Sequence, residues 1–379
     1  MKLVMATANL TVKGGAERIL LKIAQHYDAK IYVGEYAPEM TFPEFGELDV
    51  ETINRGMLLK ALPYGRAAQG LSYGIGFLNF KLQEDYDVLN AHIAPSHWIR
   101  RNNERVLWYC HTPLREVWDL YEQRMMLKRA WQKPIHALGA TAIRRIDKAI
   151  VDDIEFIYAN SENTRSRIME FFGRKDVEVL GGGIDYELYN DEGDGRYFFY
   201  PSRFSPNKRQ DYVIRAFEIF KKRTKKSYRL VLAGATSRDK AHRAYKEGIR
   251  KMAAKAGDVL IIDDPTDERM RDLFAECTAV MYAPINEDYG LVPLEGMASR
   301  KPVISVNEGE PRFTILDGKT GLLVNSEEEM ADRMLYISEH KSVAKQMGKS
   351  GYDRVKKNYS WDMFFSRFDE RVAKIAKMR

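Results

Sequence analysis

Cysteine is almost absent from this chain of 379 residues, which contains only Cys110 and Cys277. Two cysteines cannot form the framework of several bridges that holds small secreted domains together. Their scarcity argues against a disulfide scaffold and favours a reducing compartment. We therefore expect a cytoplasmic protein.

Long apolar runs are also missing, since no stretch approaches the roughly 20 residues that a membrane-spanning helix needs. The apolar start, Met1–Ala8, is too short for a signal peptide and leads directly to Gly14 and Gly15, which indicates a first strand. Repeats, low-complexity tracts and nucleic-acid-binding motifs are absent too. The net charge of +6 is therefore not taken as a sign of a nucleic-acid partner.

The positive charge is concentrated in Arg115–Lys148. Its basic residues include Arg124, Lys128, Arg129, Lys133, Arg144, Arg145 and Lys148. Apolar side chains such as Trp131, Ile135 and Leu138 are interleaved with them, which is typical of helices that lie on an anionic membrane surface. A solvated helical face on a basic protein is an equal alternative.

Short β-rich apolar runs alternate with helical periodicity along the whole chain, which predicts an α/β protein with parallel sheets covered on both faces. The predicted strands are Lys2–Thr7, Lys30–Val33, Val88–Ala91, Val106–Cys110, Ile157–Ala159, Val177–Leu180, Phe198–Pro201, Arg229–Ala233, Val259–Ile262, Ala279–Tyr282, Val303–Val306 and Gly321–Val324. The clearest predicted helices are Ala16–Tyr27, Gln210–Arg223 and Arg238–Ala254.

The length indicates two domains. The polar segment Asn190–Gly195 is the best candidate linker, so we expect an N-terminal domain over 1–190 and a C-terminal domain over 191–358. Residues 359–379 predict a terminal helix with Ser360 as its N-cap and an aromatic face that docks back on the N-terminal domain.

The segment Ala283–Gly296 carries the most informative pattern, because it places Glu287 and Glu295 eight positions apart. A buried strand ends before it, a polar turn occupies 286–290, and a helix is predicted over Leu294–Arg300. A loop and a helix N-terminus form an anion pocket, and two carboxylates suit hydroxyl groups. Diphosphate together with hydroxyls describes a nucleotide sugar, which points to glycosyl transfer.

Three further segments follow predicted strands, where ligands bind in doubly wound domains. Arg203 and Lys208 bracket a turn before a helix and suit a diphosphate, although a solvated helix start would look the same. Gly14 and Gly15 allow close backbone approach, or form only a tight turn. His111 can hydrogen-bond a sugar, although a structural histidine is the commoner case.

Metal ligands with a recognisable spacing are not apparent. His92 and His97 precede His111 without such a spacing, and the acidic pairs at 152–153 and 263–264 are ordinary loop residues. Because Arg203 and Lys208 balance the charge of a diphosphate, we expect neither a metal nor any other cofactor.

Taken together, these segments resemble the retaining glycosyltransferase family 4, which has the GT-B fold of two Rossmann-like domains facing across a cleft. The resemblance covers nearly the whole chain. It is carried by Glu287 and Glu295 with the motif between them, by Lys301–Ile304, by Arg203 with Lys208, and by Gly318–Gly321. The segment Trp108–Asp119, with its Tyr-Cys-His-Thr-Pro motif, looks like a subgroup in which many members are mannosyltransferases that use GDP-mannose.

The resemblance implies a role for each matching residue. Gly14 and Gly15 would approach the donor diphosphate, Arg203 and Lys208 would neutralise it, and His111 would contact the donor sugar. Glu287 would hold hydroxyls of the transferred sugar with backbone N–H groups of the donor-binding residues Tyr289, Gly290, Leu291 and Val292. Glu295 would hold the ribose.

The chain departs from the family at Phe313, where a glutamate is usual unless Glu308 or Glu310 substitutes for it, and at Ile262–Pro265, which lacks a glycine. We expect a metal-independent, retaining hexosyltransferase that moves mannose to a glycan or lipid-linked acceptor, with the enzyme cytoplasmic or peripheral on a membrane. A UDP-sugar donor, a nucleotide-sugar epimerase or phosphorylase, and a non-catalytic nucleotide- or glycan-binding protein are the alternatives.

Overall fold

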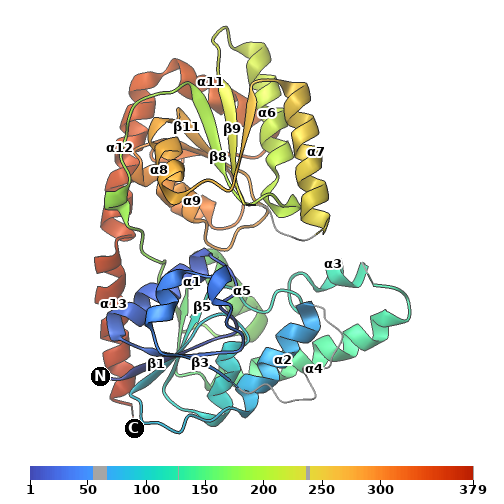
Figure 1. The fold of residues 1–379 in the computed structure, drawn as a ribbon, viewed down its shortest axis with the longest axis vertical. Coiled ribbons are helices and arrows are strands. Elements are labelled where there is room, and N and C mark those ends of the chain that lie inside the picture. Colours follow the sequence, from blue (N-terminus) through green and yellow to red (C-terminus); the bar gives the residue numbers. More distant parts are fainter. Residues whose placement is uncertain (54–65, 127, 236–239, 379) are drawn as a thin grey trace. The chain divides into compact units, whose positions relative to one another are not determined.

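The computed structural model describes residues 1–53, 66–126, 128–235 and 240–378, and it forms two compact units (Figure 1). Unit 1 comprises Met1–Gly182 together with Phe365–Arg379, and unit 2 comprises Gly183–Phe364. The chain therefore passes between the units twice. Each unit has its own sheet and its own hydrophobic core.

Unit 1 is built on a seven-stranded parallel sheet in the order β3-β2-β1-β4-β5-β6-β7. Its strands are β1 (Leu3–Thr7), β2 (Lys30–Val33), β3 (Val50–Thr52), β4 (Val88–Ala91), β5 (Val106–Cys110), β6 (Phe156–Ala159) and β7 (Val177–Val179). Its longer helices are α1 (Gly15–Tyr27), α2 (Arg66–Asn79), α4 (Gln132–Asp153) and α5 (Glu162–Phe172), and the short α3 (Tyr121–Met126) precedes α4. Because β2 and β4 flank β1 on opposite sides, the order of winding reverses between β1 and β4.

Unit 2 has a six-stranded parallel sheet in the order β10-β9-β8-β11-β12-β13. Its strands are β8 (Tyr197–Pro201), β9 (Arg229–Gly234), β10 (Val259–Asp263), β11 (Ala279–Tyr282), β12 (Val303–Val306) and β13 (Gly321–Val324). Its helices are α6 (Gln210–Arg223), α7 (Lys240–Ala256), α8 (Asp267–Glu276), α9 (Leu291–Ala298), α10 (Pro311–Thr314), α11 (Glu327–Glu339) and α12 (Lys341–Asn358). The winding reverses between β8 and β11.

The strands predicted from the sequence all form, and their ends agree closely with the prediction. This success has a physical cause: parallel strands covered on both faces appear as continuous apolar runs, and β5, β8 and β11 are buried throughout. The sequence did not predict β3. It is an edge strand of three residues, of which Glu51 and Thr52 are exposed, so it leaves no apolar pattern. The prediction of a helix over Arg238–Ala254 begins on residues outside the described part.

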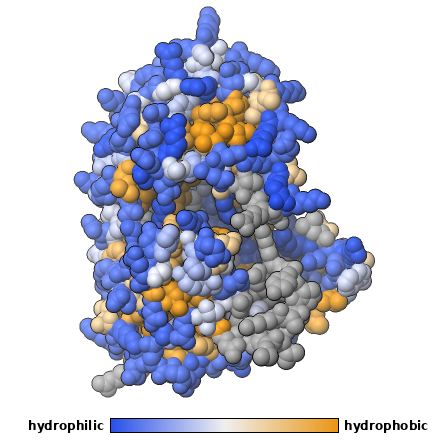
Figure 2. Space-filling model, viewed as in Figure 1, coloured by the Kyte–Doolittle hydropathy of each residue, from blue (hydrophilic) through white to orange (hydrophobic). Residues whose placement is uncertain are grey.

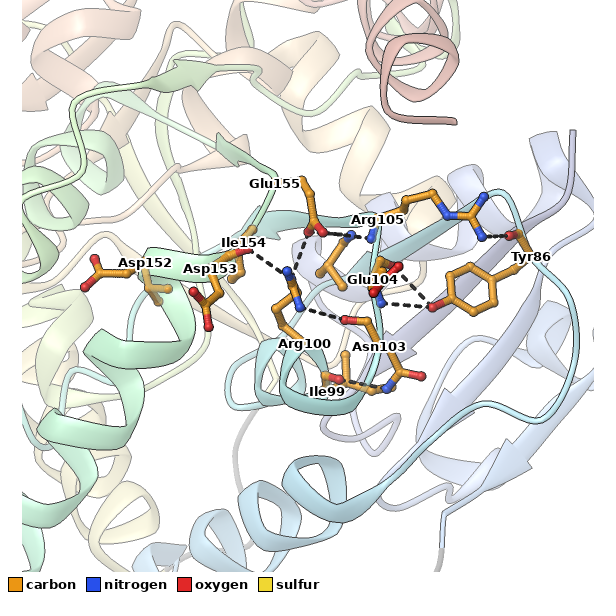
Figure 3. A network of polar contacts seen from close by, with 12 residues as sticks. Tyr86, Ile99, Arg100, Asn103, Glu104, Arg105, Asp152, Asp153, Ile154 and Glu155 are labelled. Carbon is orange, nitrogen blue, oxygen red and sulfur yellow. Dashed lines mark hydrogen bonds and ion pairs between the residues drawn. The ribbon is translucent and has the colours of Figure 1, made fainter. Parts of the chain in front are cut away.

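A network of polar contacts fixes the amino end of β5 and the end of α4 (Figure 3). The Glu155 carboxylate accepts hydrogen bonds from the backbone N–H groups of Arg105 and Val106, each at 2.9 Å. Arg100 donates to Glu155 at 3.0 Å and to the Asp153 carbonyl at 2.9 Å. These contacts hold the start of β5, the strand that ends directly before His111.

The predicted linker Asn190–Gly195 is part of unit 2, and the units divide earlier, at Gly182–Gly183. The N–H groups of Glu192 and Gly195 donate to the carbonyls that end α8, at 2.8 Å and 2.7 Å. The buried Lys301 donates to Asp191 at 2.5 Å. The polar composition indicated a linker, and the structure shows long-range hydrogen bonds that hold this segment against unit 2.

The terminal helix α13 (Trp361–Ala376) begins as predicted, with the Ser360 hydroxyl accepting from the N–H of Met363 at 3.2 Å. From Phe365 onward it belongs to unit 1. Phe368 is fully buried there, and Tyr27 donates to Asp369 at 2.5 Å. The end of the chain thus completes the core of the unit in which the chain began.

Searched over its described residues, the structure contains no helix whose length and apolarity would let it span a bilayer.

Candidate active site

The carboxyl ends of β8 and β11 bring three of the predicted residues of unit 2 to the same edge of the sheet. Arg203 follows β8, Lys208 ends the short helix η6 (Pro206–Lys208), and Glu287 follows β11. The Nζ atom of Lys208 lies 2.5 Å from a carboxylate oxygen of Glu287. Because the winding of the sheet reverses between these two strands, this is the position where open α/β sheets bind ligands.

Arg203 differs from Lys208 in its surroundings. Its side chain is exposed, and among the described residues its guanidinium has no hydrogen-bond or ion-pair partner. The Arg203 carbonyl accepts from Gln210 at 3.0 Å, which fixes the backbone. The site therefore offers one paired cation and one cation that is open to an anionic ligand.

The sequence predicted a helix that begins at Leu294. In the structure, helix α9 begins earlier, at Leu291. The difference arises because Pro293 is tolerated in the first turn of a helix, where its missing N–H has no intrahelical partner in any case. Gly290 precedes the helix with φ of 79°, and no side chain caps the N-terminus. The N–H groups of Leu291 and Val292 therefore lie in the first turn, where helix geometry favours an anion or a polar oxygen.

Glu295 lies on α9, about one turn beyond those N–H groups. Tyr189 donates a hydrogen bond from its hydroxyl to Glu295 at 3.1 Å, which orients the carboxylate. Tyr189 was not predicted from the sequence. No sequence pattern identifies it, because it is 106 positions away and lies beside the segment interpreted as a linker.

The loop that carries Glu287 is held from two sides. Arg209 donates to the Ala283 carbonyl at 2.7 Å and to Glu308 at 2.9 Å. The N–H of Glu310 donates to the Glu287 carbonyl at 3.0 Å. Gly309, with φ of 60°, packs so closely that a Cβ there would lie 2.5 Å from both the nitrogen and the carbonyl oxygen of Glu287. The sequence did not single out Arg209 or Gly309.

The same region contains Phe313, at a position where the resembled family usually has a glutamate, and the two nearby glutamates that were considered as substitutes. Phe313 is on the short α10 and is 40% exposed. Glu308 is paired with Arg209, and Glu310 is buried. The two glutamates are thus part of the support behind Glu287.

Gly14 and Gly15 lie in unit 1, at the end of the connection between β1 and α1. Gly14 caps α1 without a side-chain hydrogen bond, and a Cβ on it would lie 2.5 Å from a carboxylate oxygen of Glu17. The buried Glu17 side chain therefore folds back against the turn at Gly14. A carboxylate in the first turn complements the helix dipole.

His111 also lies in unit 1, immediately after β5, and it is 7% exposed. Its Nε2 atom lies 3.0 Å from Nδ1 of His92, a fully buried histidine that follows β4. Burial lowers the pKa of His111 to about 3 and that of His92 well below its usual range, where the neighbouring His111 lowers it further. Both imidazoles are therefore neutral near pH 7. The sequence noted His92 but gave no reason to pair it with His111.

Among the described residues, no three side chains of His, Cys, Asp or Glu are grouped so as to hold a metal ion. Asp152 and Asp153 point away from the polar network beside them in Figure 3, and Asp263 is paired with Lys246 at 2.8 Å and with Arg250 at 2.7 Å. That the enzyme needs no metal stays a prediction.

Comparisons with known proteins agree with this architecture. The family described as Glycosyltransferase Family 4 matches residues 13–188, and the family of glycosyl transferases group 1 matches residues 189–354. The mouse protein alpha-1,3/1,6-mannosyltransferase ALG2 is 28% identical over 96% of this chain and 94% of its own length.

Two solved structures have the same fold. Anabaena HepE, in complex with UDP and glucose, is similar with a TM-score of 0.75 at 16% identity. The match covers 99% of this chain and 100% of the HepE chain. Sucrose-phosphate synthase from Thermosynechococcus elongatus has a TM-score of 0.74 at 15% identity, with 99% of each chain covered.

Two Rossmann-like units with parallel sheets, matched along the chain by these families, define a GT-B glycosyltransferase. The chain belongs to the family 4 type of these enzymes and transfers a hexose.

Proposed function

We propose that this enzyme is a retaining mannosyltransferase that uses GDP-mannose without a metal and delivers mannose to a glycan or lipid-linked acceptor. The observation that carries the proposal is the similarity along 96% of the chain to proteins named alpha-1,3/1,6-mannosyltransferase. The cations and carboxylates at the switch point of unit 2 supply the chemistry that such a donor requires.

In the proposed reaction, the bond between the anomeric carbon of mannose and the diphosphate oxygen breaks, and a bond to the acceptor hydroxyl oxygen forms. The hydroxyl proton passes to the departing diphosphate. Arg203 and Lys208 stabilise the charge that develops on that diphosphate. Electrostatic stabilisation of this kind is usually the largest single contribution to catalysis. No protein nucleophile is required.

The donor is held by groups with different tasks. Glu287 accepts hydrogen bonds from sugar hydroxyls, and the N–H groups at the start of α9 support the same region. Glu295, oriented by Tyr189, accepts from the ribose hydroxyls. In unit 1, Gly14 and Gly15 approach the diphosphate, and His111 contacts the donor sugar. His111 is neutral because burial lowers its pKa, so it acts there by hydrogen bonding rather than by charge.

The donor assignment is tested by NMR of the purified enzyme with GDP-mannose, UDP-glucose, UDP-galactose and UDP-N-acetylglucosamine, with released sugar followed over time. Loss of GDP-mannose alone, with the α-anomer appearing first, is the expected result. Selective loss of a UDP-sugar would overturn the donor and leave the fold and the class of enzyme intact. That second candidate is favoured by one observation, the UDP bound to Anabaena HepE.

We also propose that the acceptor is presented at an anionic membrane surface. Around the junction of α3 and α4, the most exposed large apolar side chains among the described residues of unit 1 lie among lysines and arginines. They are Met126, Trp131, Ile135 and Leu138, which are between 63% and 79% exposed. In Figure 1, α3 and α4 form a part of unit 1 that extends to the right of the view. Figure 2 shows hydrophobic residues among hydrophilic ones on the same part. Apolar side chains that insert and cations that meet lipid phosphates together favour such binding.

Sedimentation with phosphatidylserine–phosphatidylcholine vesicles at low salt tests this surface. The wild-type enzyme should sediment with the vesicles, and the triple variant Trp131→Ser, Ile135→Ser and Leu138→Ser should not. Leu260→Ser, which changes an exposed leucine of unit 2, is the matched control and should sediment like the wild type. Equal sedimentation of both variants would rule out the α3–α4 surface.

A further inference from the structure

Three buried polar side chains at the carboxyl ends of β4 and β5 form a continuous chain of hydrogen bonds. Asn90 Oδ1 lies 2.7 Å from His92 Nε2, and His92 Nδ1 lies 3.0 Å from His111 Nε2. Asn90 and His92 are fully buried, and His111 is 7% exposed. A buried polar network whose members are all satisfied is rigid, so the position of each proton in it can be derived from its fixed partners.

The first link in the chain is fixed by the backbone of β5. The Asn90 side-chain nitrogen lies 3.0 Å from the Leu107 carbonyl oxygen, which can only accept a hydrogen bond. The amide nitrogen must therefore face Leu107, and the amide oxygen must face His92. The opposite orientation of the amide would bring two oxygens together.

This orientation determines the proton on each imidazole. An amide oxygen accepts only, so Nε2 of His92 carries its proton. A neutral imidazole has one proton, so Nδ1 of His92 is a bare acceptor. Nε2 of His111, 3.0 Å away, must then donate. The proton of His111 is thus on Nε2, and its Nδ1 has a free lone pair.

The surroundings maintain this arrangement. The His92 carbonyl accepts from the Trp108 indole at 3.3 Å, and the His92 ring stacks on Tyr109 with centroids 5.4 Å apart. The Thr164 hydroxyl donates to the His111 carbonyl at 3.4 Å. Among the described residues, none hydrogen-bonds Nδ1 of His111. That atom is therefore the part of the network that remains available to a ligand.

We propose that Asn90 and His92 are positioning residues that hold His111 in the Nε2–H tautomer, so that its Nδ1 accepts a hydrogen bond from a hydroxyl group of the substrate. The hydroxyl contact rests on the proposed function, whereas the tautomer does not. In this arrangement His111 selects a hydrogen-bond donor, and it neither binds an anion nor donates a proton to the leaving group.

Long-range ¹⁵N–¹H NMR of histidine-labelled enzyme tests the tautomer directly, because protonated and bare ring nitrogens have well-separated ¹⁵N shifts. His111→Gln identifies the His111 signals. The expected spectrum shows a bare Nδ1 and a protonated Nε2 for His111, and likewise a bare Nδ1 and a protonated Nε2 for His92. A proton on Nδ1 of His111 in the wild-type enzyme would overturn the proposal, whatever the variants show.

Asn90→Leu tests the positioning role, with Asn103→Leu as a matched control. Asn103 is a buried asparagine of the same unit whose amide holds the backbone at Leu82, Phe80 and Ile99. Both variants lose a buried amide, but only Asn90→Leu removes the group that orients His92. Only that variant should show a mixed tautomer at His111, with kcat lowered by about 10–100-fold, as when a group that orients a functional histidine is lost.

The outcomes separate the two proposals. An unchanged His111 tautomer in folded Asn90→Leu, or equal kcat in Asn90→Leu and Asn103→Leu, would overturn the positioning role. The expected tautomer in an enzyme that consumes only a UDP-sugar would overturn the donor assignment and leave the positioning role in place. Binding of the donor should shift the Nδ1 signal of His111, and an unchanged signal on saturation would overturn the hydroxyl contact.

Discussion

At the scale of single residues, the site of unit 2 is organised around pairs of opposite charge. Lys208 contacts Glu287, and Arg209 contacts Glu308 behind it. In the function proposed above, Lys208 has two tasks, because the ammonium group that contacts Glu287 also faces the departing diphosphate. The sequence predicted both residues, but it did not predict that they touch.

Lys208→Met should therefore affect both binding and turnover. Loss of the fixed cation should lower kcat by about 10²–10³, the effect of removing one preorganised charge donor. Since Glu287 loses its ion pair with residue 208, KM for the donor should rise as well. Steady-state kinetics measures both constants, and Lys222→Met, an exposed lysine on α6, is the control that should behave as wild type. Turnover close to wild type in Lys208→Met would contradict the assignment.

Gly309 supports Glu287 through its lack of a side chain. Gly309→Ala should place a methyl group against the Glu287 backbone at a left-handed φ, and the loop must then move. The strain of φ alone costs about 1–2 kcal/mol. Gly318→Ala is the matched control, because Gly318 has φ of 71° but open space around it. Both variants should be destabilised, but only Gly309→Ala should lose donor binding in calorimetry; equal donor affinity in the two would show that the contact is unimportant.

At the scale of elements, the segment Asn190–Gly195 shows how charge fixes a loop that composition alone describes as a linker. Lys301 holds its first part, and Lys341 with Thr278 holds Asp194. Burial raises the pKa of Asp194, but the hydrogen bonds from Lys341 and Thr278 outweigh it and lower the pKa below its usual value. The carboxylate form is therefore favoured in the folded protein.

A lowered pKa contributes stability above the unfolded-state value of about 4, and that stability is lost as the pH falls through the lower folded-state pKa. Lys341→Met should destabilise unit 2 at pH 7, and the difference from wild type should shrink below about pH 4. Urea unfolding followed by circular dichroism at pH 7, 5 and 3 measures this. The exposed Lys345→Met is the control. A difference that stays constant down to pH 3 would count against the ion pair.

Helix α13 completes the core of unit 1 with side chains that are fully buried, including Phe368, Val372 and Ile375. Phe368 packs against Tyr27 and Tyr158, with ring centroids 6.1 Å and 6.3 Å away. The helix belongs to the unit that begins the chain because its apolar face meets the core there.

Phe368→Ala should destabilise unit 1 by about 3–5 kcal/mol, the usual cost of removing a buried aromatic ring. Met363→Ala is the control, because Met363 is on the same helix and 41% exposed. Its effect should stay within about 0.5 kcal/mol. Tryptophan fluorescence is a suitable probe, since Trp98, Trp108, Trp118 and Trp131 all lie in unit 1. A loss below about 1 kcal/mol would mean that the helix is not needed for the core.

At the scale of the whole molecule, two separate cores make the units distinguishable in unfolding experiments. One hydrophobic cluster lies within residues 184–355 and the other within residues 4–177. Arg203, Lys208, Glu287 and Glu295 are all in unit 2. A nucleotide that binds there stabilises that unit by mass action.

GDP at about 100 times its Kd should therefore stabilise unit 2 by about 2.7 kcal/mol. Scanning calorimetry should show a transition that moves with GDP. The transition seen by tryptophan fluorescence, which reports mainly unit 1, should move less, because most of the proposed donor-binding side chains are in unit 2. Adenosine diphosphate, which has the same ribose and diphosphate but a different base, is the control for the contribution of guanine. A GDP shift seen only in fluorescence would contradict nucleotide binding by unit 2.

Much of the fold could be predicted because its elements are local. Continuous apolar runs gave the buried strands, and the pattern around Ser360 gave the start of α13. No local pattern marks β3, and none shows the distant hydrogen bonds that hold Asn190–Gly195. The start of α9 was placed too late, since Pro293 lies in its first turn, where a helix tolerates proline.

The sequence by itself determined the two α/β units, the class of enzyme it resembles and the residues that follow each strand. The tertiary structure alone decided which of those residues meet: Lys208 with Glu287, Tyr189 with Glu295, Gly309 with the Glu287 backbone, and Asn90 with His92 and His111. The physical reason is that the apolar pattern of a buried strand or helix extends over only a few neighbouring residues, so it can be recognised in the sequence. Hydrogen bonds and close packing between neighbouring strands and loops depend on the order of the strands, which no local pattern records.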